Sequence, residues 1–344
     1  MKQRGLKRAQ LKLKETDNPL VSVICPVYNA IEYFPATLKT ILEQTYRNLE
    51  IIIVDDESTD GSLNYCLEMQ EKDDRIKVYP MKHSGVSAAR NYALNMIDGE
   101  YVTFVDSDDL VKRCYVNNLI SASIRHQQSI VICKSMNGKY ASIEEFDQHQ
   151  VKESPIEEVL DFAKFRFTNK YKHDTVWGGI YKSSLIKKLK FATDLYVGED
   201  TYFFAEALSR AKSLVFVDDV YYYYTYRENS LAHQSESYKL LSEIDAWERV
   251  CSLFYNESEE FVNECKTALA FRCTKVYGLL SFSNDADSHS TNDLYIKAKK
   301  YLINVLRSKE KGLVYKTVYC FFLLSPRVYD RLMHAANNYK QGKT

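Results

Sequence analysis

Short apolar runs alternate with helical patterns over the first hundred residues of the chain. The apolar runs are Leu20–Cys25, Leu49–Val54, Ile76–Tyr79 and Tyr101–Val105, and the helical patterns between them cover 33–44, 63–70 and 86–96. Strands that are apolar along their whole length and alternate with helices predict a parallel sheet covered by helices on both faces. Ligands of such sheets bind at the carboxyl ends of the strands, so the residues that follow each strand are the first candidates for function.

The pattern is less regular after residue 109. In chain order we expect a helix over 111–126, a strand over 129–133, a polar loop over 135–154, regular structure at 162–167, two helical stretches within 181–211 around a turn at 197–200, and strands over 214–217 and 221–226. From 238 onward the sequence is helical in period almost throughout. We therefore predict three parts: a basic arm over 1–18, a sheet domain over 19–230 and a C-terminal helical domain over 231–344.

Composition places the chain among ordinary globular proteins. Of its 344 residues 45% are hydrophobic and 27% are charged, which argues against a disordered or fibrous protein. Lys and Arg total 46, and so do Asp and Glu, so no net charge attracts nucleic acid. The eight cysteines form no CxxC pair, no run of about 20 apolar residues occurs, and the N-terminus lacks the apolar segment of a secretory signal. These features predict a cytoplasmic protein.

Both ends of the chain carry a candidate for peripheral membrane contact. Six basic residues precede the first acidic residue, Glu15, and the leucines among them give a weak apolar stripe. This arm is either a solvated tail or a segment that lies on an anionic membrane. Near the C-terminus, Leu313–Ser325 is apolar but too short to span a bilayer, and it contains Lys316. A buried helix and an interfacial helix both remain open for it.

Acidic and polar side chains follow three of the first four predicted strands, in the segments 26–29 (PVYN), 55–58 (DDES) and 106–109 (DSDD). Carboxylates a few ångströms apart resist simultaneous ionisation, so their convergence favours a bound divalent cation. Mg²⁺ uses one or two protein carboxylates and completes its shell with phosphate oxygens, which makes Asp108 a candidate ligand beside a diphosphate. Capping of the next helices is the alternative, and it explains Ser58–Asp60 equally well.

Four segments in this order resemble the signature segments of the family 2 glycosyltransferases, which have the GT-A nucleotide-sugar fold. They are VSVICPVYN (21–29), QTYRNLEIIIVDDESTD (44–60), GVSAARNYAL (85–94) and GEYVTFVDSDD (99–109). Several linked motifs are more specific than a single DxD. The resemblance covers about residues 20–230 and implies a GT-A-type three-layer α/β/α fold with a mainly parallel sheet. It also implies inverting transfer of a sugar from a UDP-sugar to an acceptor hydroxyl with Mg²⁺ or Mn²⁺.

The resemblance assigns the donor side to residues of these segments. Pro26 and Tyr28 would shape the base pocket, Asp56 with its neighbour Asp55 would contact the base, Asp106 would contact the ribose or the donor sugar, and Asp108 would hold the metal. Arg90 lies in the helix that Gly85 opens, where its guanidinium reaches a carboxylate or a phosphate oxygen, or makes a surface salt bridge. We place Arg90 with the donor-binding residues.

The resemblance assigns the acceptor side to later segments. Asp200 would be the general base that takes the proton of the acceptor hydroxyl, with Glu199 orienting the acceptor or the base. Trp177–Tyr181 resembles the acceptor segment, although Gly179 stands where many relatives carry Lys. Arg227 would close over the diphosphate, and His233 is a weaker candidate metal ligand.

Two other functions compete with a sugar transferase. A nucleotidyltransferase would need a glycine-rich basic loop after the first strand, which 26–29 does not offer. A non-catalytic sugar-nucleotide binding module would not need Asp108 and Asp200. Chains similar to this one commonly build bacterial capsule, exopolysaccharide, O-antigen or teichoic acid, so a glycan or lipid-linked acceptor is expected. The donor sugar, the linkage and the oligomeric state are open.

Overall fold

The first part of the chain forms alternating strands and helices, as predicted. The computed structural model describes residues 18–139, 150–161, 174–226, 237–281 and 288–326, together with Phe146, Gln148, Val328 and Tyr329. Its first elements are β1 (Val21–Val27), α1 (Phe34–Leu42), β2 (Leu49–Asp55), α2 (Ser62–Lys72), β3 (Ile76–Pro80), α3 (Val86–Met96) and β4 (Tyr101–Phe104). β1 pairs in parallel with β2 and β4, and β2 pairs in parallel with β3, which confirms the predicted parallel sheet.

The sheet continues beyond β4 with mixed pairing. The next elements are β5 (Leu110–Val111), α4 (Tyr115–His126), β6 (Ile130–Lys139), β7 (Glu157–Asp161), β8 (Gly179–Lys182), α6 (Ser183–Ile186), α7 (Glu199–Ala211) and β9 (Ser213–Tyr226). In the described residues the nine strands have the order β3-β2-β1-β4-β8-β6-β9-β5, and β7 pairs with β9. The chain adds β2 and β3 on one side of β1 and then β4 on its other side, so the strand order reverses at β1. Ligands of α/β sheets bind at such points.

The strands expected at 214–217 and 221–226 are one continuous strand, β9. Asp218 and Asp219 interrupt its apolar pattern, which suggested a break. In the structure Lys134 and Lys152 pair with the Asp218 carboxylate, and Asp219 Oδ2 accepts the Lys152 backbone N–H at 2.8 Å. Because both carboxylates have partners, the strand continues through them.

Other boundaries also differ from the prediction. β6 extends to Lys139, into the loop expected at 135–154, because its parallel pairing with β9 reaches that far. The helix expected from 111 begins only at Tyr115, since Leu110–Val111 pairs with β9 as β5. The first helical stretch expected after 181 shrinks to the four residues of α6, and Tyr181 belongs to β8. β7 had no predicted counterpart, and both 162–167 and the boundary near 230 lie outside the described residues.

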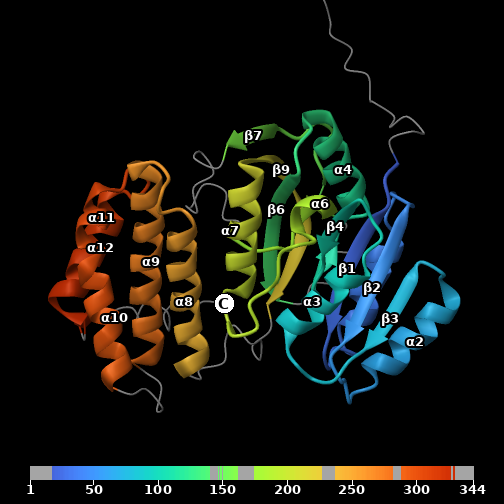
Figure 1. Cartoon of the computed structure of the whole chain (residues 1–344), viewed down its shortest axis with the longest axis horizontal. Helices are drawn as coiled ribbons and strands as arrows, with labels where there is room; N and C mark the ends of the chain where they lie inside the picture. The colour runs from blue at the N-terminus through green and yellow to red at the C-terminus, as the bar shows by residue number, and fades with distance from the viewer. Residues whose placement is uncertain are drawn as a thin grey trace, which may run out of the picture.

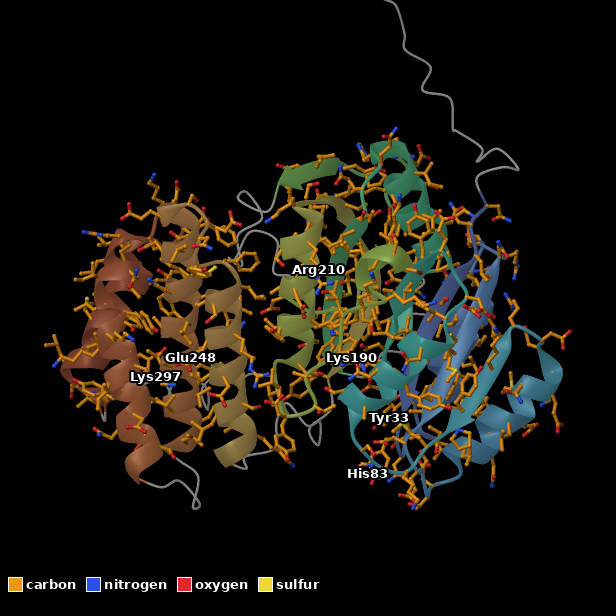
Figure 2. All side chains as sticks on the ribbon, in the orientation of Figure 1. Tyr33, His83, Lys190, Arg210, Glu248 and Lys297 are labelled. Atoms are coloured by element: carbon orange, nitrogen blue, oxygen red, sulfur yellow. The ribbon has the colours of Figure 1, made fainter. Side chains whose placement is uncertain are left out.

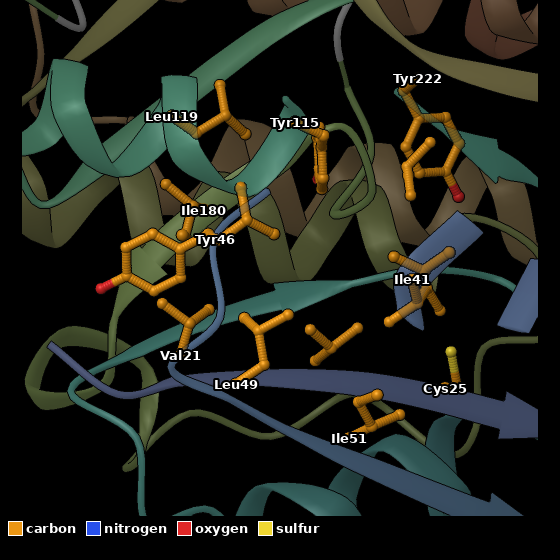
Figure 3. Close-up of a cluster of buried hydrophobic side chains, with 14 of the residues drawn as sticks. Val21, Cys25, Ile41, Tyr46, Leu49, Ile51, Tyr115, Leu119, Ile180 and Tyr222 are labelled. Carbon is orange, nitrogen blue, oxygen red and sulfur yellow. The ribbon is translucent and has the colours of Figure 1, made fainter. Parts of the chain in front are cut away.

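Two apolar layers lie on opposite faces of the sheet. One contains alternate strand residues such as Val23 and Ile51, packed against α1, α2 and α4, and Figure 3 shows part of it. The other contains the intervening residues, such as Ile24 and Ile52, packed against α3 and α7. Successive side chains of a strand point to opposite faces, so a fully apolar strand contributes to both layers. This is the predicted three-layer α/β/α arrangement.

Helices α8 to α12 form a further layer beside α7 (Figure 1). They are α8 (Ser237–Leu253), α9 (Glu259–Leu280), α10 (Ser288–Lys300), α11 (Leu302–Arg307) and α12 (Leu313–Leu324). Their buried side chains, among them Trp247, Leu269 and Phe322, form a cluster that also includes Ala205 of α7. α7 thus packs against the sheet on one side and the C-terminal helices on the other. None of the helices in the described part of the chain is long and apolar enough to cross a bilayer.

Candidate active site

The loops after β1 and β2 are held together at the carboxyl edge of the sheet. The Asn29 backbone N–H donates to Ser58 Oγ at 3.0 Å, and the Asp60 carboxylate accepts the N–H of Ser62, the first residue of α2. Asn29 and Glu57 have positive φ angles of 44° and 64°. Non-glycine residues rarely adopt this conformation, which is found mostly in turns and at functional sites. Ser58 and Asp60 therefore have the structural role that the sequence had left open.

Tyr28 and His83 form an aromatic pair at this edge. Their ring centroids are 4.4 Å apart, with 31° between the ring planes. Tyr28 is 49% exposed, and the His83 side chain is 51% exposed. His83 lies in the loop between β3 and α3. Figure 2 shows it at the lower edge of the sheet. The exposed rings offer a stacking surface to a planar base. The sequence did not single out His83, because one histidine in a polar loop carries no pattern.

Asp56 is fixed at the N-terminus of α3. Its carboxylate accepts the backbone N–H groups of Ser84 at 2.7 Å and Gly85 at 2.9 Å, and His83 Nδ1 lies 3.0 Å from its Oδ2. Gly85 has φ 88°, a conformation that glycine adopts without strain, as its predicted role required. The unpaired N–H groups and the dipole of a helix N-terminus favour a carboxylate. The start of α3 therefore holds Asp56 beside the Tyr28–His83 pair.

Pro26 and Asp55 lie beneath this surface. Pro26 is in β1, two residues beyond Ile24, the last residue of the ladder between β1 and β4, so that pairing does not need its missing N–H. Asp55 is fully buried, and its Oδ2 accepts the Ser58 N–H at 3.0 Å. Asp55 thus fixes the turn that follows β2, and Pro26 is buried two residues before Tyr28.

A buried arginine joins carboxylates from two distant segments. Arg90 of α3 is 3% exposed, and it donates from Nη2 to Asp106 Oδ1 at 2.7 Å and from Nη1 to Glu199 Oε1 at 2.9 Å. Burial works against its charge, but Asp106, Glu199 and Asp200 together raise the pKa of Arg90 above its ordinary value. Arg90 is therefore cationic. The sequence predicted a carboxylate or a phosphate oxygen as the partner of Arg90, and the structure shows carboxylates. Because Arg90 is buried, these ion pairs are not surface salt bridges.

The carboxylates of the 106–109 segment have different surroundings. Asp109 is fully buried, with Oδ2 accepting the Tyr222 hydroxyl at 2.6 Å and Oδ1 accepting the Thr225 N–H at 2.8 Å. Burial and the charges of Asp108 and Asp106 raise the pKa of Asp109 well above its ordinary value. Asp109 joins this segment to β9 and does not cap the next helix. Asp106 and Asp108 remain partly exposed.

Glu199 and Asp200 form the first turn of α7, directly after Gly198 with its φ of 90°. Asp200 is partly exposed as a residue, but its carboxyl group is surrounded by protein atoms. This burial raises the pKa of Asp200 well above its ordinary value; the charge of Glu199 raises it further, and Arg90 lowers it. Asp200 Oδ1 also accepts the Thr201 N–H at 2.7 Å within the same turn. A carboxylate with a raised pKa is suited to accept a proton near neutral pH.

Comparison with known proteins identifies the family. The sequence profile described as glycosyl transferase family 2 matches residues 22–193, half of the chain. The chain belongs to glycosyl transferase family 2. It is 35% identical over 224 residues to glycosyltransferase GlyA of Streptococcus pneumoniae, and this match covers 62% of the chain but 31% of GlyA.

A second relative of this family 2 chain is a putative teichuronic acid biosynthesis glycosyltransferase, TuaG of Bacillus subtilis. The two are 47% identical over 96 residues, which cover 28% of the chain and 38% of TuaG. The matches thus span about a third of each relative's length. Among solved structures, S. aureus TarS 1–349 in complex with UDP-GlcNAc aligns with a TM-score of 0.62 and 22% identity. That alignment covers 83% of this chain and 81% of TarS, and it shows a shared fold.

Packing explains the glycine at 179 in this family 2 glycosyltransferase. Gly179 is buried in β8, where an added Cβ would lie 3.1 Å from the Tyr181 hydroxyl and 3.2 Å from Ile132 Cγ2. A lysine would not fit this position without rearrangement. Nearby, the Trp177 ring stacks on Tyr222 and Tyr224, with centroids 4.8 and 5.4 Å apart. Arg227 and His233 lie outside the described residues.

Proposed function

We propose that this protein transfers a sugar from a UDP-sugar to an acceptor hydroxyl with inversion at the sugar carbon. The observation that carries the proposal is the buried bridge from Asp106 through Arg90 to Glu199, the neighbour of Asp200. It links the carboxylates assigned to the donor with the carboxylate assigned to the acceptor. Family 2 membership supports the reaction class, and the fold shared with TarS, which was solved with UDP-GlcNAc, supports the donor class.

The donor side would bind the nucleotide through stacking and one directed hydrogen bond. The exposed Tyr28 and His83 rings would stack on the base, and base stacking on an aromatic side chain contributes about 1–3 kcal/mol. The Asp56 carboxylate accepts the N–H groups of Ser84 and Gly85, just before α3, and would accept one from uracil. Pro26 and Asp55 would keep these loops in place. Arg227 would contact the diphosphate.

A divalent cation, Mg²⁺ or Mn²⁺, fits the oxygen ligands that Asp108 and Asp106 provide. Within the described ranges no three His, Cys, Asp or Glu side chains are arranged to hold an ion by themselves. A shell completed by diphosphate oxygens, as Mg²⁺ commonly has, needs only one or two of these carboxylates. When bound, the metal would neutralise the charge that develops on the leaving diphosphate. Arg90 holds Asp106 by one oxygen and so fixes its orientation.

Asp200 would act as the general base. Burial and the neighbouring Glu199 raise its pKa, which increases its affinity for the proton of the acceptor hydroxyl. As the acceptor oxygen attacks the sugar carbon, its proton passes to Asp200 and the bond to the diphosphate breaks. The charge of Arg90 lowers the pKa of Asp200 and so limits how tightly Asp200 binds the proton.

Substitution of the base tests this proposal. Asp200→Asn should lower kcat at least about 100-fold, the usual contribution of a general base, while the Kd for UDP changes little. UDP release from UDP-Glc, UDP-Gal, UDP-GlcNAc and UDP-GalNAc, with and without Mg²⁺ or Mn²⁺, gives both the rate and the donor preference. Asp74→Asn, at an exposed aspartate, is the control. Retained turnover in Asp200→Asn would reject the base, and release of pyrophosphate instead of UDP would favour a nucleotidyltransferase.

The acceptor that we propose is a glycan from bacterial surface polysaccharide synthesis, carried on a lipid. The relative TuaG, a putative teichuronic acid biosynthesis glycosyltransferase, supports this setting. A lipid-linked acceptor would place the protein at the inner face of the cell membrane. The exposed apolar side chains of α12 support such a peripheral contact.

A further inference from the structure

The loop that leads into Glu199 and Asp200 rests directly on α8. A Cβ built on Gly198 would lie 2.7 Å from Ala246 Cβ and 3.7 Å from Glu243 Cα. Real Cβ atoms do not approach this closely, so only glycine allows the loop backbone and α8 to meet here. The positive φ of Gly198, 90°, is a second reason for glycine. The C-terminal helices therefore contact the chain at the residue before the Glu199–Asp200 pair.

Ser242 of α8 fixes the same loop by hydrogen bonds. Its Oγ accepts the backbone N–H of Val197 at 2.8 Å and that of Tyr196 at 3.2 Å. Its hydroxyl hydrogen has two carbonyl acceptors, Lys239 O at 2.7 Å and Val197 O at 3.2 Å. Ser242 is 5% exposed, so water does not readily replace these bonds. One side chain thus satisfies the backbone of the two residues before Gly198.

α9 makes a second contact with the acceptor side. Arg272 donates from Nη2 to Asp174 Oδ2 at 2.7 Å and from Nη1 to Glu243 Oε1 at 2.8 Å. Asp174 lies three residues before Trp177, and its charge is among those that raise the pKa of Asp200. The C-terminal helices thus contact Asp174 through Arg272 of α9, and they contact the 196–198 loop through Ser242 of α8.

We propose that α8 and α9 set the position of the general base, with Ser242 as the positioning residue that acts on Asp200 through the loop 196–198. This inference rests on the proposed function of Asp200. Asp200 follows Val197 by three residues, so a displaced loop moves the carboxylate. A displacement of about 1 Å at a reacting group can lower the rate about 100-fold.

Ser242→Ala removes the loop hydrogen bonds and leaves α8 otherwise unchanged. Titration with UDP gives the concentration of binding-competent sites, and kcat is expressed per site. We expect kcat per site to fall by about tenfold, which is less than the loss of about 100-fold for a base displaced by about 1 Å. The Kd for UDP should stay within about twofold of the wild-type value. The matched control is Ser252→Ala on the same helix, whose hydroxyl bonds only to Glu248 O at 2.9 Å among the described residues. It should keep the wild-type kcat.

The double variant Ser242→Ala with Asp200→Asn separates positioning from general structural damage. If Ser242 acts through Asp200, its substitution should change the residual turnover of Asp200→Asn by less than about twofold. A wild-type kcat per site in Ser242→Ala, or equal losses with and without Asp200, would overturn the positioning role. Wild-type turnover in Asp200→Asn alone would instead reject the proposed base and this inference with it. If Ser242→Ala binds no UDP, Ser242→Cys, which retains weak hydrogen bonding, is measured in the same way.

Discussion

At the scale of single residues, three charged side chains, Arg90, Glu199 and Asp200, set the electrostatics of the candidate site. Arg90 is held by two carboxylates from opposite sides of the site and does not need a ligand to be neutralised. Glu199 has two effects, because its charge raises the pKa of Asp200 directly while it orients the guanidinium that lowers it. The proton affinity of Asp200 is thus the balance of these neighbours and its own burial.

Glu199→Gln should make the enzyme active at lower pH. Glutamine keeps an oxygen for Arg90 Nη1 but removes the negative charge beside Asp200, so the pKa of Asp200 falls. The base works when deprotonated, and activity is lost as the pH falls through its pKa. The acid limb of the kcat/KM profile should therefore move to lower pH, as measured by UDP release. Glu206→Gln, on the same helix but paired with Arg210, should leave the limb in place. A limb that stays or moves to higher pH in Glu199→Gln would contradict the expected coupling.

At the scale of elements, the start of α3 connects backbone conformation to the proposed nucleotide site. The N–H groups of Ser84 and Gly85 point at the Asp56 carboxylate because Gly85 has φ 88° and ψ 164°. Residues other than glycine rarely adopt this region. The same short turn places His83 against Tyr28. A change of turn conformation should therefore disturb stability and base recognition together.

Gly85→Ala should lower the free energy of unfolding by about 1–3 kcal/mol, the cost of a non-glycine residue in this region. No atom lies within 4 Å of the added Cβ, so the cost comes from the backbone and not from a clash. Urea denaturation measures the loss, and calorimetry should show weaker UDP binding in the same variant. Gly312→Ala, at φ −65° and also in open space, should be less destabilising and leave UDP affinity unchanged. Equal losses of stability in the two variants would argue against backbone strain at Gly85.

At the scale of the whole molecule, the outer helix α12 exposes apolar side chains at the end remote from β1–β3 (Figure 1). Tyr319 and Phe322 face the bundle and are buried, while Leu313 and Leu324 are 81% and 84% exposed. In α12 and the described residues after it, the exposed apolar side chains are Leu313, Val314, Tyr315, Val318, Phe321, Leu324 and Val328. The helix therefore packs in the bundle through one face, and membrane contact of its exposed apolar face stays a prediction.

If this exposed face contacts a membrane, the protein should sediment with vesicles of phosphatidylcholine and phosphatidylglycerol. Leu313→Glu with Leu324→Glu should reduce the bound fraction more than about tenfold, because burial of one leucine contributes about 1.5–3 kcal/mol and 1.4 kcal/mol is tenfold. Ile296→Glu, at a 55% exposed position of α10, is the matched control. Wild-type protein that stays in the supernatant would contradict the contact.

The sequence by itself determined the strand and helix order of the first hundred residues and the carboxylates at the strand ends. These features depend on local periodicity, which a buried, mostly apolar strand such as Leu49–Asp55 or a helix such as α1 carries in its own residues. The family motifs added the assignments of Asp56, Asp106, Asp108 and Asp200, of which the structure gives the surroundings.

Only the tertiary structure decided which distant residues meet. β9 is one strand because Lys134 and Lys152 neutralise a charge that breaks its pattern. Arg90 of α3 is buried because Asp106, which follows β4, and Glu199 of α7 meet it from 16 and 109 residues away. His83 and Ser242 carry no local signal at all. Their partners come from other elements, and contacts of that kind depend on packing, which no pattern along one segment encodes.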